Sequence, residues 1–514
     1  MMKLLVALIF LVALLFFDHL MADLPVLREM RGIIFYGGWI QSFSLWNGIA
    51  YPIGRISAAS RMAAMLFSAF DARVCGFDAR CINTSQAMLL SATAGLLFLH
   101  LTQLLANRWA PALLALLWCL SLPALEGGLW QATQLDKLAM SFSLLYLIVL
   151  FRFIRQPETT ATGYLSCNIL LVLLLFLAFK SKETSFFLVP VTVLVVLLEG
   201  ASDGVERILA QALFVVLPVG YGIFYLQYYL RHIPPDMHAH IGAGNPVVVV
   251  PVLLLAMLGD APLLGLGNWG DDYRHLAATA VATMTLLIIL AAVSFIIARR
   301  ITAAGLDQTA RTGIYLAGVL ACNVLILART MYPHAYYLII AEGALLGLIG
   351  LAVLAPIRSL SPPVDSARRF GLLGLLGVAM LLCYAAQRSP GTAIARIQHM
   401  SRIVNDGFAT IRSAVPAEAI TDVQFLFPTP IDGDWYFFGS IKNDGGPDPE
   451  MMSFIYGRRV PVYVTYRYGP TGTWAPNPAG IMRVVWAADG SVRDIELGST
   501  HVFMAARPAS THPD

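Results

Sequence analysis

The chain has 514 residues, of which 58% are hydrophobic and 13% charged, and its net charge is +3. Soluble domains carry roughly 25% charged residues, and a mean hydropathy of +0.71 is too high for a single soluble core. The near-neutral charge and the six cysteines also exclude a basic nucleic-acid binder, a disordered chain and a disulfide scaffold. The sequence therefore predicts an all-α polytopic membrane protein.

Apolar runs recur along the first three quarters of the chain. A helix of about 20 apolar residues crosses a hydrocarbon core of about 30 Å. Eleven runs are long enough, near 4–22, 86–106, 109–125, 138–154, 164–179, 185–199, 208–230, 276–298, 312–328, 335–356 and 370–386. A further run at 247–258 is shorter and contains Pro251, which favours a re-entrant or interfacial element. No clear cleavage site follows the first run, so we expect an uncleaved anchor rather than a signal peptide.

The basic residues orient these runs. With the N-terminus inside, the inner segments carry eleven Lys and Arg residues and the short outer loops carry four, as the positive-inside rule requires. The N-terminus is then cytoplasmic. The outer face carries the loop at about 23–85, the loop at about 231–275 and the tail. Abundant Ala, the use of Arg over Lys and short inner loops favour a bacterial inner membrane.

The tail has the pattern of a small α/β domain. Residues 460–468 alternate as a strand does, and residues 481–497 read as a hairpin around Asp489–Gly490, a dipeptide typical of hairpin turns. We therefore expect a transmembrane domain at 1–386 and a periplasmic α/β domain at 387–514. This domain either selects an acceptor or caps the site below it.

The first polar cluster closes the first apolar run. Asp18 and His19 are expected at the outer membrane edge, with Asp23 just beyond. His19 and Asp23 are four residues apart, so we expect them to share a helix face. Charged groups in spans are costly and usually functional. The alternative is that these residues only mark the end of the anchor.

Lysine is concentrated in two short outer turns. The protein has five lysines, and three of them are Lys137, Lys180 and Lys182. Since Arg is used freely elsewhere, this choice of a compact ammonium suggests a phosphate or carboxylate partner. The polar residues that accompany these lysines are Glu126, Trp130, Gln131, Gln134 and Asp136 in the first turn and Ser181 and Glu183 in the second.

A fourth cluster, Arg329, His334, Tyr336 and Tyr337, lies at the same predicted edge. The alternative for its tyrosines is an interfacial aromatic belt. Together the four clusters place carboxylates, cations and aromatic rings on one side of the membrane. A channel or carrier tends to place its polar groups near the midplane. The arrangement therefore favours a reaction at the outer interface on a lipid-borne substrate.

Several of these motifs resemble those of GT-C-type integral membrane glycosyltransferases, in particular the polyprenyl- or dolichyl-phosphate-mannose-dependent O-mannosyltransferase-like members. Pro123-x-x-Glu126-x-x-x-Trp130 followed by Asp136 is similar to their P-x-x-E-x-x-x-W…D stretch. Ser181-Lys182-Glu183-Thr184, with Pro190 after it, resembles their S-K-E-[ST]…P turn. Gly76-Phe77-Asp78 resembles their F-G-[LF]-[DN] run, and residues 329–337 resemble their R…RYxYLP region more loosely. The likeness covers roughly residues 1–340.

The sequence departs from the family pattern at three places. The family's near-adjacent acidic pair becomes Asp18-His19, with the next carboxylate at Asp23. Its H-x-x-N becomes Asn83-x-x-Gln86, and the basic residue before the D of the third-loop motif is absent around Gln134. These changes leave the substrate and catalytic competence open.

The resemblance implies transfer of a sugar from a polyprenyl-phosphate carrier to a glycan, lipid or protein acceptor at the outer face. Asp18 is then the first choice for the general base, with Asp23 as the substitute. Lys182, Lys180 and Arg329 are the candidates for binding the lipid phosphate. Residues 247–258 are a plausible wall for the polyprenyl tail. The candidates for binding the sugar or orienting these cations are His19, Glu126, Trp130, Asp136, Lys137, Glu183, His334 and Tyr337.

We expect no cofactor, no dedicated metal site and no nucleic-acid partner. His232, His238 and His240, with Asp236, are loosely spaced in a Pro-containing loop, which is more typical of solvated surface than of a metal site. Whether Cys75 and Cys81 pair stays open. Two alternative functions also stay open: a non-catalytic GT-C-like scaffold of envelope glycan assembly, and a carrier or flippase for a lipid-linked glycan.

Overall fold

The computed structural model describes residues 2–24, 62–105, 109–129, 133–155, 161–200, 215–232, 253, 301–302, 305–327, 338–354, 393–428, 448, 450–469, 477–487 and 489–505. These residues form two compact units. The first holds residues 1–19, 43–65 and 86–392, and the second holds residues 20–42, 66–85 and 393–514. Three helices, α1 (Met2–Met21), α5 (Met62–Cys75) and α6 (Ala79–Leu104), are divided between the two units.

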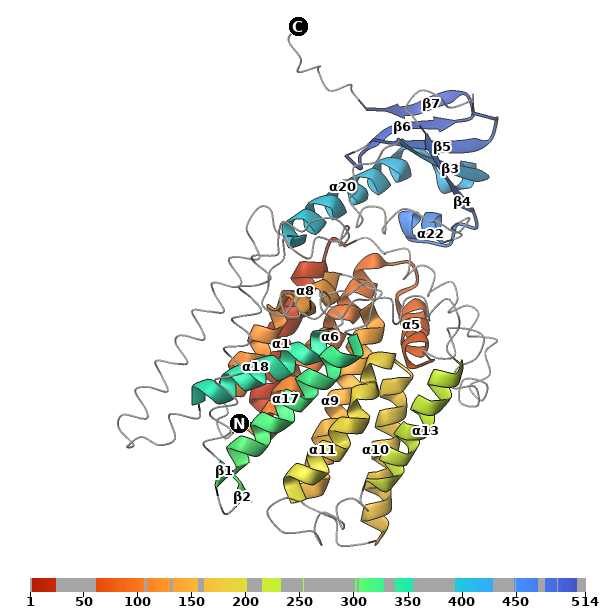
Figure 1. The fold of residues 1–514 in the computed structure, drawn as a ribbon. Helices are drawn as coiled ribbons and strands as arrows, with labels where there is room; N and C mark the ends of the chain where they lie inside the picture. The colour runs from red at the N-terminus through yellow and green to blue at the C-terminus, as the bar shows by residue number, and fades with distance from the viewer. Residues whose placement is uncertain are drawn as a thin grey trace. The chain divides into compact units, whose positions relative to one another are not determined.

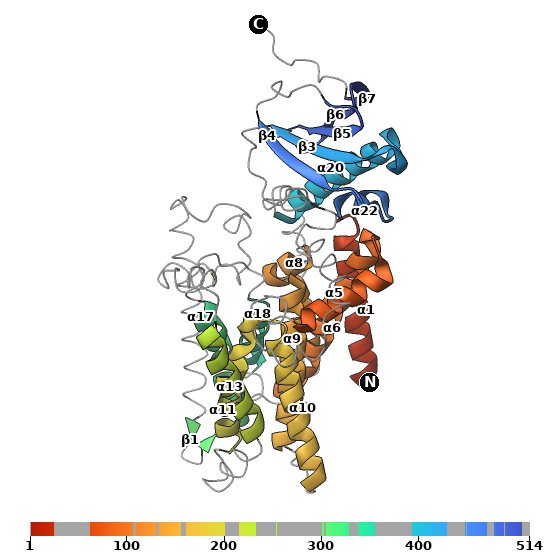
Figure 2. The same ribbon diagram turned by 90° about the vertical axis from the view of Figure 1, so that its right-hand side faces the viewer.

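The first unit is a bundle of helices (Figures 1 and 2). Its elements, with α1 and α6 counted whole, are α1 (Met2–Met21), α6 (Ala79–Leu104), α7 (Trp109–Cys119), α8 (Leu122–Leu129), α9 (Gln134–Arg155), α10 (Ala161–Phe179), the 3-10 helix η2 (Glu183–Phe187), α11 (Leu188–Gly200), α13 (Val216–His232), the strands β1 (Ile301–Thr302) and β2 (Gly305–Leu306), α17 (Gln308–Leu327) and α18 (Ile339–Leu354).

Five helices within the described residues are long and apolar enough to cross a membrane, or six if the bent pair α7 and α8 counts as one span. Two further apolar helices, at 216–227 and 339–351, are shorter. This confirms a helical multi-pass protein but not the predicted number of eleven crossings. The predicted runs at 276–298 and 370–386 lie outside the described residues.

The predicted run at 109–125 is not one helix. It ends at Cys119, and α8 begins at Leu122. Pro123 explains the restart, because proline has no N–H to lose in the first turn of a helix and its backbone angle is already helical. The break places Glu126 on a short separate helix instead of in a loop.

Glycines allow α18 to pack closely in the centre of the bundle. A Cβ at Gly343 would lie 3.0 Å from Leu97 on α6, and one at Gly347 would lie 3.1 Å from Leu316 on α17. Side chains at these positions would force the helices apart, which is why small residues line helix contacts in membranes.

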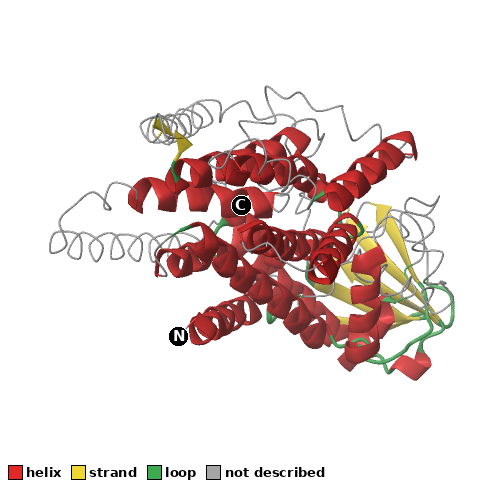
Figure 3. Cartoon of the chain, turned by 90° about the horizontal axis from the view of Figure 1, so that it is seen from below, coloured by secondary structure: helices red, strands yellow, loops and turns green. Residues whose placement is uncertain are grey.

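The second unit contains the C-terminal domain and α5 (Met62–Cys75), of which the first turn belongs to the first unit. The elements of the C-terminal domain are α20 (Ala393–Ala414), η6 (Ala417–Ala419), β3 (Asp422–Pro428), α22 (Met451–Tyr456), β4 (Val464–Gly469), β5 (Ile481–Trp486), β6 (Val492–Leu497) and β7 (Thr500–Met504). Apart from the short β1–β2 pair, the strands gather in one sheet (Figure 3).

That sheet has the order β4-β3-β5-β6-β7. Strand β3 is parallel to β4 and β5, whereas β5, β6 and β7 are antiparallel neighbours. The β5–β6 hairpin confirms the one predicted at 481–497. The core of the C-terminal domain contains Phe425 and Trp486. Helix α20 packs against this core through Gly407, where a Cβ would lie 2.9 Å from the Trp486 ring.

Candidate functional site

Polar side chains gather where α9 begins. Six of them, which we call the lysine cluster, come from α6, α9 and the turn between α10 and η2: Gln86, Gln134, Asp136, Lys137, Lys180 and Lys182. All six are buried. The structure thus brings together the lysines that the sequence places in two separate turns.

An ion pair joins the two turns. The Nζ of Lys182 donates to Oδ2 of Asp136 at 2.7 Å, and these side chains are 10% and 5% exposed. Asp136 lies in the first turn of α9, where the positive end of the helix dipole stabilises a carboxylate. Lys182 has extended backbone and precedes η2. The S-K-E turn is therefore fixed against the start of α9.

Two hydrogen-bonded glutamine side chains support Lys137. The Nζ of Lys137 donates to Oε1 of Gln86 at 3.0 Å, and Nε2 of Gln86 donates to Oε1 of Gln134 at 3.1 Å. Nε2 of Gln134 in turn donates to the carbonyl of Ala64 at 3.1 Å. Each donor has a defined acceptor, so the chain orients both glutamines and links α9 and α6 to the first turn of α5.

Lys180 is completely buried. Its Nζ lies 5.8 Å from the ring centroids of both Phe176 and Tyr225, within reach of cation–π attraction. Its carbonyl accepts a hydrogen bond from the N–H of Ala63 at 3.1 Å. Burial lowers the pKa of this lysine, in the turn after α10, to about 8. A bound anion would favour its charged form.

Two glutamates lie at the same end of the bundle. Glu126 is buried on α8, and Glu183 is partly buried at the start of η2. The hydroxyl of Thr133 donates to the carbonyl of Gly127 at 2.7 Å, which ties α8 to the start of α9. Glu183 thus follows directly on Lys182 of the lysine cluster, and Glu126 stands on a helix that Thr133 ties to the start of α9.

The two acids at the end of the first span, Asp18 and Asp23, lie in the helix and in the turn after it, respectively. Asp18 lies in the last turn of α1 and is partly buried, and its neighbour Phe17 lies 3.5 Å from the position that a Cβ at Gly128 would take. This contact places Asp18 at the lysine-cluster end of the bundle. His19 and Asp23 are exposed. They do not share a helix face as predicted, because α1 ends at Met21 and Asp23 lies in the following turn.

Several predicted residues lie outside the described part of the chain. They are Trp130, Gln131, Asp236, His238, His240, Arg329, His334, Tyr336, Tyr337 and all of 247–258 except Leu253. Their roles stay predictions. The described residues do settle one open question, because Cys75 and Cys81 form a disulfide.

Two groups that contact the lysine cluster, and one buried carboxylate elsewhere in the bundle, were not predicted from the sequence. Ala64 accepts from Gln134 through its backbone, and Tyr225 lies beside Lys180; neither leaves a signal in the sequence. Glu342 on α18 is 3% exposed, and its Oε2 makes no hydrogen bond to the part of the chain that the structure describes. A lone carboxylate in the apolar run 335–356 was a usable signal.

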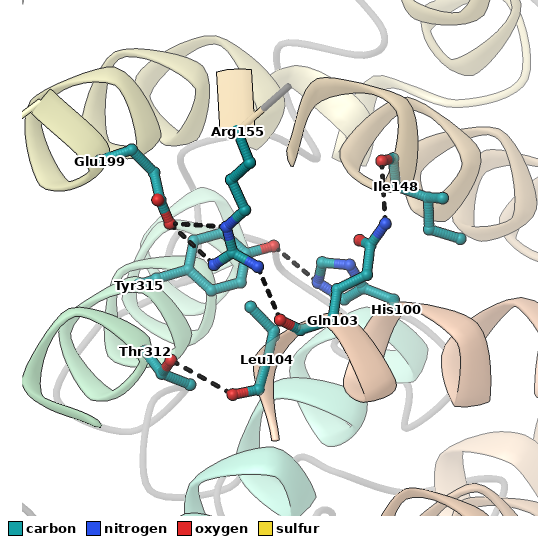
Figure 4. Close-up of polar contacts among 8 residues, drawn as sticks. All are labelled: His100, Gln103, Leu104, Ile148, Arg155, Glu199, Thr312 and Tyr315. Carbon is teal, nitrogen blue, oxygen red and sulfur yellow. Dashed lines mark hydrogen bonds and ion pairs between the residues drawn. The ribbon is translucent and has the colours of Figure 1, made fainter. Parts of the chain in front are cut away.

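A second polar group lies at the other end of α9 (Figure 4). Arg155 donates through Nε and Nη2 to Glu199 on α11, at 3.2 and 2.8 Å, and through Nη1 to the carbonyl of Gln103 at 2.7 Å. His100 and Tyr315 share a hydrogen bond of 2.9 Å. We call these five residues the arginine clamp. Together with Phe151, Arg311 and neighbouring side chains, Arg155, Glu199 and Tyr315 line a small pocket.

The fold defines a class: a multi-pass membrane protein with a bundle of apolar helices and a small sheet-containing domain. Among solved structures, the chain is similar to ArnT from Cupriavidus metallidurans bound to undecaprenyl phosphate, with a TM-score of 0.50 and 12% identity. The likeness covers 89% of this chain and 85% of that one. No protein-family model and no curated protein sequence matches the chain. The likeness supports the predicted GT-C fold and does not extend to the mannosyltransferase-like family.

Proposed function

We propose that the protein is a membrane glycosyltransferase that moves a sugar from a polyprenyl-phosphate-linked donor to an acceptor at the outer face of the membrane. The lysine cluster is the observation that carries this proposal. Three of the five lysines of the chain are buried near the start of α9, and together they concentrate positive charge at this end of the bundle. Such a site suits an anion delivered from the bilayer.

The fold likeness supports the same substrate class. The ArnT structure is described as bound to undecaprenyl phosphate, a polyprenyl phosphate. The motifs around Glu126 and Lys182 add a donor of the polyprenyl-phosphate-mannose type as the narrower proposal. An apolar bundle leaves the isoprenoid tail in the bilayer while the phosphate reaches the cluster.

The proposed reaction is a displacement at the anomeric carbon. An acceptor hydroxyl oxygen forms the new bond to this carbon as the bond from carbon to the lipid phosphate oxygen breaks. Asp18, or Asp23 in its place, takes the proton of the hydroxyl as general base. The departing phosphate keeps the electron pair, and charge-assisted hydrogen bonds from lysine stabilise it.

Each charged residue of the candidate site has a proposed role in this reaction. Lys182 and Lys180 bind the phosphate, with Arg329 as a third cation from the motif. Because Asp136 bonds to Lys182 at 2.7 Å, it aims that ammonium. The remaining proposed contacts of the sugar are His19, Glu126, Trp130, Lys137, Glu183, His334 and Tyr337. The proposed location is a bacterial inner membrane, with a cytoplasmic N-terminus and a periplasmic C-terminal domain.

The test compares lipid extracts by mass spectrometry from cells that carry the wild-type protein, Asp18→Asn or Asp23→Asn. A glycosylated polyprenyl phosphate that accumulates with one variant alone supports the transferase and identifies the base. If both variants are stably expressed and give wild-type extracts, the protein is a scaffold instead. Movement of the glycolipid across vesicles without a new glycosidic bond would identify a carrier.

A further inference from the structure

The C-terminal domain forms one compact unit with two segments from the beginning of the chain, residues 20–42 and 66–85. The described part of the first segment, residues 20–24, includes the turn with Asp23, and the second runs from α5 into α6. Residues nearly 400 positions apart therefore share a single packed unit. The contacts that join them are specific.

Two asparagines hold the turn after α1. Nδ2 of Asn405 on α20 donates to the carbonyl of Asp23 at 2.6 Å. Nδ2 of Asn83 on α6 donates to the carbonyl of Leu24 at 2.8 Å, and Asn83 is completely buried. The N–H of Leu24 also donates to the carbonyl of Met21 at 3.2 Å. Consecutive carbonyls are thus fixed from two elements, while the Asp23 side chain stays exposed.

A second contact holds the same elements in place. Phe77, in the turn that the Cys75–Cys81 disulfide closes, packs edge-to-face against Phe454 of α22 at 5.4 Å between ring centroids. Phe454 also packs against Ile82, which is completely buried one residue before Asn83. The C-terminal domain therefore contacts the turn with Asp23 directly and, through Ile82, the helix turn that carries the second asparagine.

We propose that the C-terminal domain positions the Asp23 carboxylate for the transfer reaction, with Asn405 as its positioning residue. This inference rests on the proposed function and on Asp23 as a group of the site. An amide that bonds to the Asp23 carbonyl restricts the backbone from which the carboxylate projects. A misplacement of about 1 Å costs a catalytic group about a hundredfold in rate, so such a bond matters for a residue in a turn.

The test uses the full-length protein in lipid nanodiscs and the variant Asn405→Asp. Aspartate keeps the shape of asparagine but offers the Asp23 carbonyl an oxygen instead of an N–H donor. We expect kcat to fall about tenfold with little change in KM for the donor, and the amides of residues 21–24 to exchange with deuterium faster. Asn405→Ala removes the donor without adding charge and should show the same losses.

The matched control is Gln398→Glu, which adds the same charge at a partly exposed position of α20. It should keep both kcat and amide protection. If Asn405→Asp behaves like this control, or loses protection but keeps kcat, the inference is wrong. If the wild-type protein transfers no sugar and Asn405→Asp still loses protection, the proposed function fails, while the hold of the C-terminal domain on residues 21–24 stands.

Discussion

The two ends of α9 solve the burial of positive charge in opposite ways. At its first residues the lysine cluster buries Lys137, Lys180 and Lys182 together. At its last residue the arginine clamp uses one guanidinium, which bonds to the Glu199 carboxylate and to a carbonyl at the end of α6. Asp136 and Arg155 are 19 positions apart on the helix, or about 28 Å at 1.5 Å per residue.

The difference lies in which cation is used. Arginine is always charged and its planar fork fits a carboxylate and a carbonyl at once, so it suits a permanent link between helices. The ammonium of lysine is compact, and burial shifts its pKa, as at Lys180. A lysine ammonium can therefore exchange one anionic partner for another. We infer that the lysine cluster at the start of α9 binds the substrate anion, whereas the arginine clamp at its last residue holds the helices of the bundle together.

Lys182→Met should have the largest effect. Removing a single donor from a site that stabilises a developing charge costs about a hundredfold or more in rate, and this ammonium is the one that Asp136 aims. The measurement is the rate of polyprenyl phosphate release by purified protein. Because the change leaves a buried carboxylate, Lys182→Met/Asp136→Asn is the control for stability. It should melt closer to the wild-type protein and stay inactive; recovered activity would exclude Lys182 from phosphate binding.

Arg155→Met should act on stability and not on transfer. It leaves Glu199, 11% exposed, without its ion pair, which costs about 2 kcal/mol after allowance for the 28% exposure of Arg155. Thermal unfolding in detergent should begin a few degrees lower, while the rate per folded molecule stays unchanged. Arg152→Met, at an exposed position of the same helix turn, is the matched control. A loss of rate in Arg155→Met alone would end the division of roles between the two ends.

Lys180 should make donor binding depend on pH. Its pKa of about 8 means that the ammonium is charged below pH 8 and neutral above it. The KM for the donor should therefore rise as pH increases from about 7 to about 9, by up to about tenfold if this cation contacts the phosphate. In Lys180→Arg the guanidinium stays charged over this range, so the rise should disappear. The same rise in that variant would assign the titration to another group.

Apolar runs predicted the helical bundle because length and hydropathy alone decide which segments stay in a bilayer. The hairpin at 481–497 was predictable because its turn and alternation are local. Other features depend on contacts that no local pattern contains. The break before α8 needed Pro123 to be read as a helix start, and the parallel pairing of β3 with β4 and β5 joins segments far apart in the sequence.

The charged residues of the candidate site could be predicted from the sequence, but the groups that orient them could not. Lysines 137, 180 and 182 stood out because so few lysines occur elsewhere. The groups that support the site did not stand out: Ala64 offers Gln134 a carbonyl, which every residue has, and Asn405 reaches the carbonyl of Asp23 across 382 positions. Glutamine 86 appeared only as a departure from a motif, yet it bonds to both Lys137 and Gln134. Charge is visible in a sequence, whereas the geometry that orients it is not.

An exposed ion pair in the C-terminal sheet serves as a reference for the buried charged groups at the two ends of α9. Nδ1 of His501 on β7 lies 2.9 Å from Oδ2 of Asp494 on β6, and the histidine side chain is 48% exposed. The hydrogen bond to Asp494 and then its charge raise the pKa of His501 above its usual value. A pKa raised on folding stabilises the folded protein below the unfolded value and loses this contribution as pH rises through the folded value.

We therefore expect the smallest effect from Asp494→Asn. NMR titration of the histidine rings should show the pKa of His501 returning towards about 6.5. The melting temperature of the variant should be slightly below that of the wild-type protein near pH 5.5 and equal to it near pH 8.5, since a solvent-exposed pair contributes little. A change as large as that of Arg155→Met would mean that burial is not what separates the arginine clamp from an ordinary surface pair. The contrast between the two ends of α9 would then rest on the choice of lysine or arginine alone.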